Sequence, residues 1–258
     1  MKYTSSNTNS VEKALTILLA FTANRPVWGV RELSAHLNFS PATVQRLLTT
    51  LKNYAFVNQN PETRQYCLGN IYFNFLHALQ SSNPISHLAL PYMKKLASAT
   101  QETVHLNVID GMERICIENI ESMQYLKASM PIGSRSPLYA GASSKCLLAF
   151  SSPEFIDNYV KQIKLVPLTN ETIINKKVLL RELHQIKLQG YAISLGERNP
   201  GLGSLSAPIF NHNHNLLAAL SLAVPEIRFK KESHRHNGLN LLTQTARTIS
   251  KAMGAGTL

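Results

Sequence analysis

Helical periodicity and short polar breaks alternate along the first forty residues. Apolar residues recur at the spacing of one helix face, at Val11, Ala14, Leu15, Leu18 and Phe21. Ser10 is placed to cap the first turn of this predicted helix, and Arg25-Pro26 ends it. A short second helix is predicted over about 31–37, followed by a tight turn at 38–39.

A third helix has the clearest start signal in the chain. Ser40 can accept hydrogen bonds from the free amides of the next turn, and Pro41 stands where a missing N–H costs nothing. The periodicity runs to about Tyr54 and predicts a buried inner face made of Val44, Leu47, Leu48 and Leu51. The polar side chains are left on the outer face: Thr43, Gln45, Arg46, Thr49 and Lys52.

Two short β-like runs follow, at 56–59 and 65–68. The polar connection from Asn60 to Arg64 is typical of a turn, so the pair is predicted to be a hairpin. Three helices followed by a hairpin is the order of a winged helix-turn-helix.

The chain then divides. A helix is predicted over 70–79, and Ser81-Ser82-Asn83-Pro84 interrupts it. We therefore predict a DNA-binding domain over 8–70, a linker helix over 71–84 and a second domain over 85–258.

The second domain has a mixed pattern. After a helix over 86–100, strands are predicted at 103–109, 114–120, 125–129, 191–194, 204–210 and 216–224, and helices at 144–150, 154–164, 174–189 and 233–253. Hairpin signals at Asp110-Gly111 and at 211–215 favour an antiparallel sheet with helices packed on it. The fold class is therefore α+β.

The third helix has what a major-groove reader needs: a well-defined start, an apolar back and polar side chains near its N-terminal end. Arg46 is suited to guanine and Gln45 to adenine, and Ser40 and Thr43 can reach phosphate or a base edge. Phosphate contacts are expected from Arg31, Lys52 and the wing residue Arg64, and Ala42 and Thr49 complete the predicted DNA-binding set. By itself such a helix is more often plain solvated surface; the preceding helix, the turn and the hairpin favour DNA binding.

Composition permits this function without locating it. The 258 residues carry a net charge of +11, with seven basic and three acidic residues up to position 80 and nineteen and twelve after it. No segment is apolar and long enough for a membrane span or a signal peptide, so we expect a cytoplasmic protein without membrane partners. Three cysteines without close spacing support neither a disulfide framework nor a zinc knuckle.

Several segments resemble one family of regulators. These are Ser10–Leu15, Arg31-Glu32-Leu33, Thr43–Leu51, Tyr66–Gly69, Glu102–Leu106, Ile132–Lys145, Gly190-Tyr191-Ala192, Gly196-Glu197-Arg198, Ala207-Pro208-Ile209 and Ala219-Leu220-Ser221. In this order, over roughly residues 10–253, they are similar to the isocitrate-lyase-regulator (IclR) family. The resemblance implies a winged helix-turn-helix joined to a GAF-like effector domain, assembled as a homodimer or homotetramer. It also implies repression or activation under control of a small organic ligand, and we favour repression.

The resemblance also places an effector site. It puts Tyr125 and Ala128 on the pocket wall, Ala142 and Ser143 on the loop that enters a helix, and Ser204 and Ser221 on two late strands. Small residues at a helix start leave backbone N–H groups open to an anion, although such a turn is more often only a cap. Ala223 stands where relatives that bind keto acids have a serine, so no keto-acid effector is transferred. The prediction is a small, anionic effector.

Other sequence features give weaker evidence of a binding or catalytic site. His212 and His214 lie in a turn without a nearby third ligand, so no metal is predicted, and Gly201-Leu202-Gly203 lacks the third glycine of a dinucleotide loop. No cofactor and no catalytic residue is expected. Two alternatives stay open: an enzyme that acts through the second domain, and an architectural DNA-binding protein without an effector.

Overall fold

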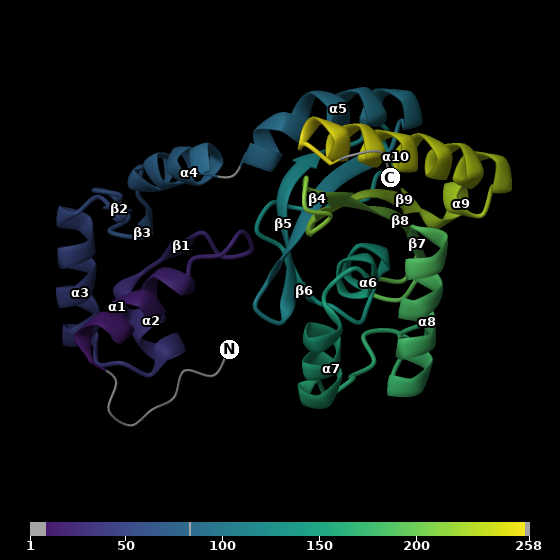
Figure 1. Cartoon of the computed structure of the whole chain (residues 1–258). Coiled ribbons are helices and arrows are strands. Elements are labelled where there is room, and N and C mark those ends of the chain that lie inside the picture. Colours follow the sequence, from purple (N-terminus) through teal and green to yellow (C-terminus); the bar gives the residue numbers. More distant parts are fainter. Residues whose placement is uncertain (1–8, 83, 256–258) are drawn as a thin grey trace. The chain divides into compact units, whose positions relative to one another are not determined.

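A computed structural model describes residues 9–82 and 84–255 (Figure 1). The chain divides into two compact units, within residues 1–82 and 83–258, and each is described by itself. Among the described residues, no helix is long and apolar enough to cross a membrane.

The first unit follows the predicted order of three helices and a hairpin. Its elements are α1 (Ser10–Leu19), β1 (Val27–Trp28), α2 (Val30–Leu37), α3 (Pro41–Asn53), β2 (Val57–Gln59), β3 (Tyr66–Leu68) and α4 (Ile71–Ser82). The strands form an antiparallel sheet in the order β1-β3-β2. Strand β1 was not predicted, because two residues are too few to show an alternating pattern.

Helix α1 is capped one residue earlier than predicted. The Asn9 side chain accepts a hydrogen bond from the Glu12 amide, and the Glu12 carboxylate accepts one from the Asn9 amide, both at 2.9 Å. This reciprocal pair satisfies two free amides at once, so the predicted cap at Ser10 is wrong.

Helix α3 begins as its sequence predicts. The Ser40 hydroxyl accepts a hydrogen bond from the Thr43 amide at 3.2 Å, and Pro41 is the first helical residue. All four predicted inner residues are buried, in a core completed by Ile17, Phe21, Trp28, Leu33, Val57 and Tyr66. The core therefore joins α1, α2 and α3 to the hairpin and fixes the outer face of α3.

The hairpin of β2 and β3 forms the wing. Its turn is held by the Asn60 side chain, which accepts hydrogen bonds from the amides of Glu62 and Thr63 at 2.8 and 3.0 Å. The wing closes against the end of α3 at Gly69, where a Cβ atom would lie 1.9 Å from the carbonyl oxygen of Ala55. Only glycine fits there.

The second unit is built on one sheet. Its elements are α5 (Pro84–Thr100), β4 (Thr103–Asp110), β5 (Glu113–Ile120), β6 (Arg135–Pro137), α6 (Ala142–Ala149), α7 (Pro153–Gln162), α8 (Lys176–Gln189), β7 (Ala192–Leu195), β8 (Leu202–Phe210), β9 (Leu216–Pro225), α9 (Glu226–Phe229) and α10 (Glu232–Ala252). The strands pair antiparallel in the order β6-β5-β4-β9-β8-β7. The predicted α+β class with an antiparallel sheet is confirmed.

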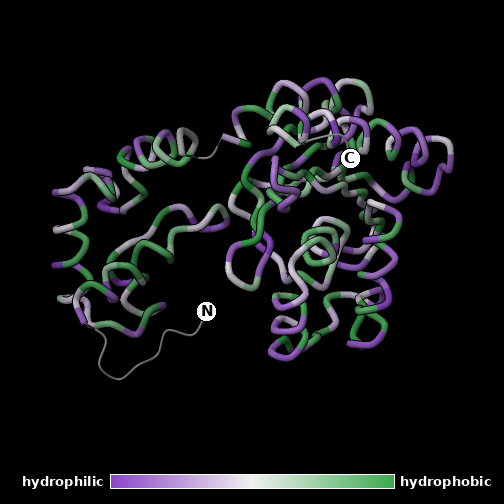
Figure 2. Tube along the Cα trace, viewed as in Figure 1, coloured by the Kyte–Doolittle hydropathy of each residue, from purple (hydrophilic) through white to green (hydrophobic). Residues whose placement is uncertain are grey.

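Helices cover both faces of this sheet. Helices α5 and α10 lie on one face and α6, α7 and α8 on the other (Figure 1). Figure 2 shows hydrophobic residues gathered along the central strands and alternating with hydrophilic ones along the outer helices. Each face has its own core, around Met93 and Leu220 on the α5 side and around Leu147 and Leu183 on the α6 side.

Strand β4 is buried on both faces but is apolar on only one. In β4, Val104 and Leu106 enter the core under α5 and α10. The alternate residues His105 and Asn107 are therefore directed to the α6 face, where they are also buried. His105 of this polar stripe lines a cavity on the α6 side of the sheet.

One prediction for this unit is corrected. Residues 121–134 form a loop, so the strand predicted at 125–129 is absent and the short strand β6 follows instead. The last predicted helix, 233–253, agrees with α10, which begins at Glu232, and the short helix α9 that precedes it was not predicted.

Candidate functional site

The outer face of α3 is the first candidate site. Ala42, Gln45, Arg46, Thr49 and Lys52 are exposed, and Thr43 is half-buried at the first turn. The Ser40 hydroxyl lies 2.8 Å from the Thr43 hydroxyl while it caps the helix. Ser40 and Thr43 thus hold the helix start, which leaves Gln45 and Arg46 as the longest polar side chains in the first two turns.

Gln45 and Lys52 are held by the wing. The Gln45 amide donates to the Tyr66 hydroxyl at 3.2 Å and to the Thr49 hydroxyl at 3.3 Å. Lys52 donates to the Gln59 side chain at 3.2 Å. The wing therefore orients two side chains of the outer face before any DNA is present.

Three arginines of this unit are not neutralised by acids. In the described residues the Arg31, Arg46 and Arg64 side chains are exposed and form no ion pair within 4.0 Å. Glu12 is used in the α1 cap, and Glu32 pairs with Arg25 at 3.4 Å. The cationic side chains are therefore open to a polyanion.

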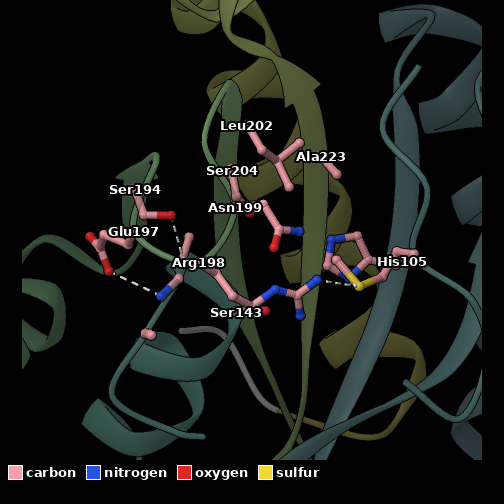
Figure 3. Close-up of a pocket in the computed structure, with 13 residues that line it drawn as sticks. His105, Ser143, Ser194, Glu197, Arg198, Asn199, Leu202, Ser204 and Ala223 are labelled. Carbon is pink, nitrogen blue, oxygen red and sulfur yellow. Dashed lines mark hydrogen bonds between the residues drawn. The ribbon is translucent and has the colours of Figure 1, made fainter. Parts of the chain in front are cut away.

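The second candidate site is a cavity of about 30 Å³ between the sheet and the start of α6 (Figure 3). Its walls come from β4, the 121–134 loop, the α6 start, β7, the 196–201 loop, β8 and β9: His105, Met130, Ala140, Gly141, Ala142, Ser143, Ser194, Glu197, Arg198, Asn199, Leu202, Ser204 and Ala223. This volume holds one or two water-sized groups, since a water needs about 10–15 Å³. Asn199 is exposed, so the cavity lies near the surface at this loop.

A buried hydrogen-bond chain runs below the cavity. The Arg114 guanidinium donates to the Ser136 hydroxyl and to the Asn107 side-chain oxygen, both at 2.8 Å. The Asn107 amide nitrogen lies 2.8 Å from His105 Nδ1 and 3.4 Å from the Ser221 hydroxyl. Residues of four strands are tied together in this way.

The hydrogen-bond chain contains a charged arginine next to a neutral histidine, which is unusual for a protein interior. Arg114 is fully buried, and burial, with repulsion from Arg198, lowers its pKa to about 10, so it is charged at neutral pH. Burial, and then the charge of Arg114, lowers the pKa of His105 to about 3, so its imidazole is neutral. His105 Nε2 and one terminal nitrogen of Arg114 are buried without a hydrogen-bond partner.

A cluster of ion pairs around Lys145 lies at the α6 end of the cavity. The Lys145 ammonium of α6 lies 2.5 Å from Glu197 and 2.9 Å from Glu182 of α8. The Glu197 carboxylate also accepts a hydrogen bond from the Gly141 amide at 3.0 Å, and the Ala142 amide donates to Ser194 at 3.0 Å. Gly141 has a φ of 90°, which favours glycine at this turn.

Comparison with known proteins identifies the chain. Residues 10–61 match the IclR helix-turn-helix domain, and residues 77–251 match the C-terminal domain of bacterial transcriptional regulators of the IclR type. The chain belongs to the IclR family.

Relatives of this IclR-family regulator match along most of its length. It is 34% identical to the HTH-type transcriptional regulator KdgR of Dickeya chrysanthemi over 247 residues, covering 95% of this chain and 80% of that protein. It is 28% identical to the HTH-type transcriptional repressor AllR of Escherichia coli, covering 95% and 90%. The crystal structure of Thermotoga maritima IclR superimposes with a TM-score of 0.81 at 29% identity, covering 96% and 100%. The chain is thus a helix-turn-helix transcriptional regulator with a C-terminal ligand-binding domain.

The predicted effector residues of this regulator fall into three groups. Ala142, Ser143 and Ser204 line the cavity. Ser221 lies below it, hydrogen-bonded to Ser206 at 2.8 Å, and Ala128 is buried, with its carbonyl oxygen bonded to Thr103.

Tyr125 is the exception. It was predicted on the pocket wall, but its side chain is fully exposed and does not line the cavity. The physical reason is that 121–134 is a loop, so no strand alternation directs this residue inward.

Sequence reasoning missed Arg114, Met130, Ser194 and Arg198 as site residues. A signal for part of the site was present: polar residues alternate with apolar ones on strands that are otherwise core-like, as in Thr103–Val108 and Leu202–Ala207. Nothing local marks Met130 or Arg198, because loops brought to one point by the sheet have no periodicity.

The remaining histidines and cysteines give no sign of a metal or redox site within the described residues. His212 and His214 lie in the β8–β9 turn, and within residues 9–82 and 84–255 no three His, Cys, Asp or Glu side chains gather as metal ligands. Cys146 is fully buried, and burial raises the pKa of its thiol to about 12. A thiol with this pKa is not a nucleophile at neutral pH.

Proposed function

We propose that this IclR-family regulator represses its target genes by binding a DNA operator through α3 and the wing. Gln45 and Arg46 read bases in the major groove, and Ala42 and Thr49 contact the same surface. Ser40 and Thr43 hold the start of α3 against the DNA backbone. Arg31, Lys52 and Arg64 contact phosphates. The exposed, unpaired Arg46 guanidinium beside the wing-bound Gln45 supports this proposal.

We further propose that a small anionic organic effector binds in the cavity at the α6 start and changes operator affinity. Ala142, Ser143 and Ser204 contact it, and Ser221 supports the wall from below. Unneutralised buried cations beside a cavity favour an anion, because a charge of opposite sign offsets their desolvation.

In this proposal the linker helix at 71–84 carries the signal between the DNA-binding domain, 8–70, and the effector domain, 85–258. A homodimer or homotetramer presents two recognition helices to paired half-sites, so a small change in their spacing alters affinity. The protein acts in the cytoplasm, where the chromosome is.

The test maps the DNA bound by the full chain across the genome and then measures affinity for the recovered operator by fluorescence anisotropy. Titration with small carboxylates and with their uncharged amides is expected to change operator affinity for a carboxylate only. Equal affinity for operator and random DNA would contradict operator recognition. Effects confined to cations or to uncharged compounds would contradict the anionic effector.

A further inference from the structure

The sulfur of Met130 occupies an unusual position. It lies 3.5 Å from a terminal nitrogen of Arg114, 3.5 Å from a terminal nitrogen of Arg198 and 3.4 Å from the Ser134 hydroxyl. Arg198 extends across the cavity toward His105, as Figure 3 shows. Three donors, two of them cationic, thus converge on one uncharged thioether.

A thioether is a weak acceptor, whereas a guanidinium is best matched by a carboxylate. In the described part of the chain, neither Arg114 nor Arg198 forms an ion pair. The carboxylates next to them along the chain are already used: Glu197 is bound to Lys145 and to the Gly141 amide, and Glu113 pairs with Arg135 at 3.5 Å. The protein therefore supplies two cations to this point and no anion of its own.

The groups around the sulfur have unused hydrogen-bond capacity. Arg114 has one buried terminal nitrogen without a partner, and so does His105 at Nε2. Because Arg114 donates to the Asn107 oxygen, the Asn107 amide is left to donate to His105 Nδ1. The His105 proton then sits on Nε2, a donor without a partner on a residue that lines the cavity.

We propose that a carboxylate of the effector displaces the Met130 thioether and binds between Arg114 and Arg198, with His105 Nε2 as an additional donor. The proposal rests on the proposed function, in which this cavity is the effector site. Since the cavity holds only one or two water-sized groups, the Met130 side chain must leave for an organic acid to enter. The Met130 sulfur thus occupies the position that the anion takes in this proposal.

The test places a carboxylate at the sulfur position without needing the natural effector. Glutamate and glutamine match methionine in length, so full chains with Met130→Glu and Met130→Gln differ only in charge. Without added ligand at pH 7.5, Met130→Glu is expected to melt about 4 °C or more above Met130→Gln, because it completes two charge-assisted hydrogen bonds. In an Arg198→Gln background this difference should shrink by half or more.

A matched pair at a surface methionine is the control. Met123 is 93% exposed in the same loop, so Met123→Glu and Met123→Gln should melt at the same temperature. If Met130→Glu melts below Met130→Gln, or fails to fold where Met130→Gln folds, the carboxylate site is refuted. Should both fail to fold, Arg198→Gln alone decides: removal of an unpaired, repelled cation should leave the melting temperature unchanged or raised, and a clear decrease overturns the proposal.

Operator affinity separates this proposal from the function on which it rests. Met130→Glu mimics the effector-bound state, so its operator affinity should differ from that of Met130→Gln by at least tenfold. A higher melting temperature with equal operator affinity would uphold the anion site and refute effector control of DNA binding.

Discussion

At the scale of single residues, Gln45 and Arg46 are neighbours on α3, but only the Gln45 side chain is held in place by a hydrogen bond to the wing. Gln45 is hydrogen-bonded to Tyr66 of the wing, while the exposed Arg46 side chain forms no ion pair in the described chain. The helical period alone predicted that both lie outside, because it depends only on the burial of Val44, Leu47 and Leu48.

We expect Arg46→Ala to weaken operator binding by about 10- to 100-fold and to relax specificity at one base, because a bidentate contact contributes about 1–3 kcal/mol. Lys52→Ala is the comparison: it should weaken binding to all sequences alike and lower the salt slope by about one. Fluorescence anisotropy on operator and random duplexes at several salt concentrations measures both. Unchanged specific binding by Arg46→Ala would refute its base-reading role.

His105 makes stability depend on pH. Its pKa in the folded chain is about 3, against an ordinary pKa of 6.5 for histidine, so between these values the unfolded chain binds a proton that the folded chain does not. The stability contributed by neutral His105 is complete above pH 6.5 and is lost as pH falls toward 3.

From pH 7 to pH 5 this loss is about 2 kcal/mol, at about 1.4 kcal/mol per pH unit below 6.5. Over the same interval the free energy of unfolding of His105→Gln should fall by about 2 kcal/mol less than that of the unaltered chain, as measured by urea denaturation. His212→Gln, in an exposed turn, should follow the unaltered chain. Equal pH dependence in all three proteins would show that His105 is not responsible.

At the scale of elements, the start of α6 is positioned by an ion group rather than by a side-chain cap. Lys145 holds Glu197 of the cavity loop and Glu182 of α8 together, and Glu197 receives the Gly141 amide. The two acids differ in burial: the Glu197 side chain is 10% exposed and that of Glu182 is 35% exposed.

We therefore expect unequal effects from two identical substitutions. Glu197→Gln breaks a buried pair and should lower the free energy of unfolding by about 3 kcal/mol or more. Glu182→Gln removes a half-exposed partner and should cost about 1 kcal/mol or less. Urea denaturation at pH 7.5 compares them, and equal losses would contradict a central role for Glu197.

At the scale of the whole molecule, net charge predicted little about the sites, whereas the pattern of turns and strands predicted much of the fold. The excess of basic residues is spread over both units, so net charge did not locate either site. The antiparallel sheet was readable from the hairpin signals between its strands. The loop at 121–134 was not, because its apolar residues gave a false strand at 125–129.

By itself, the sequence determined the helices and wing of the first unit, the α3 start at Ser40-Pro41 and the order of family motifs. These depend on residues within a few positions of one another, where caps, turns and helical periods act. Only the tertiary structure decided that Arg114 of β5, Met130 of the following loop and Arg198 of the β7–β8 loop meet at one point. Long-range strand pairing sets that meeting, and no local period along the chain records which distant residues a sheet will bring together.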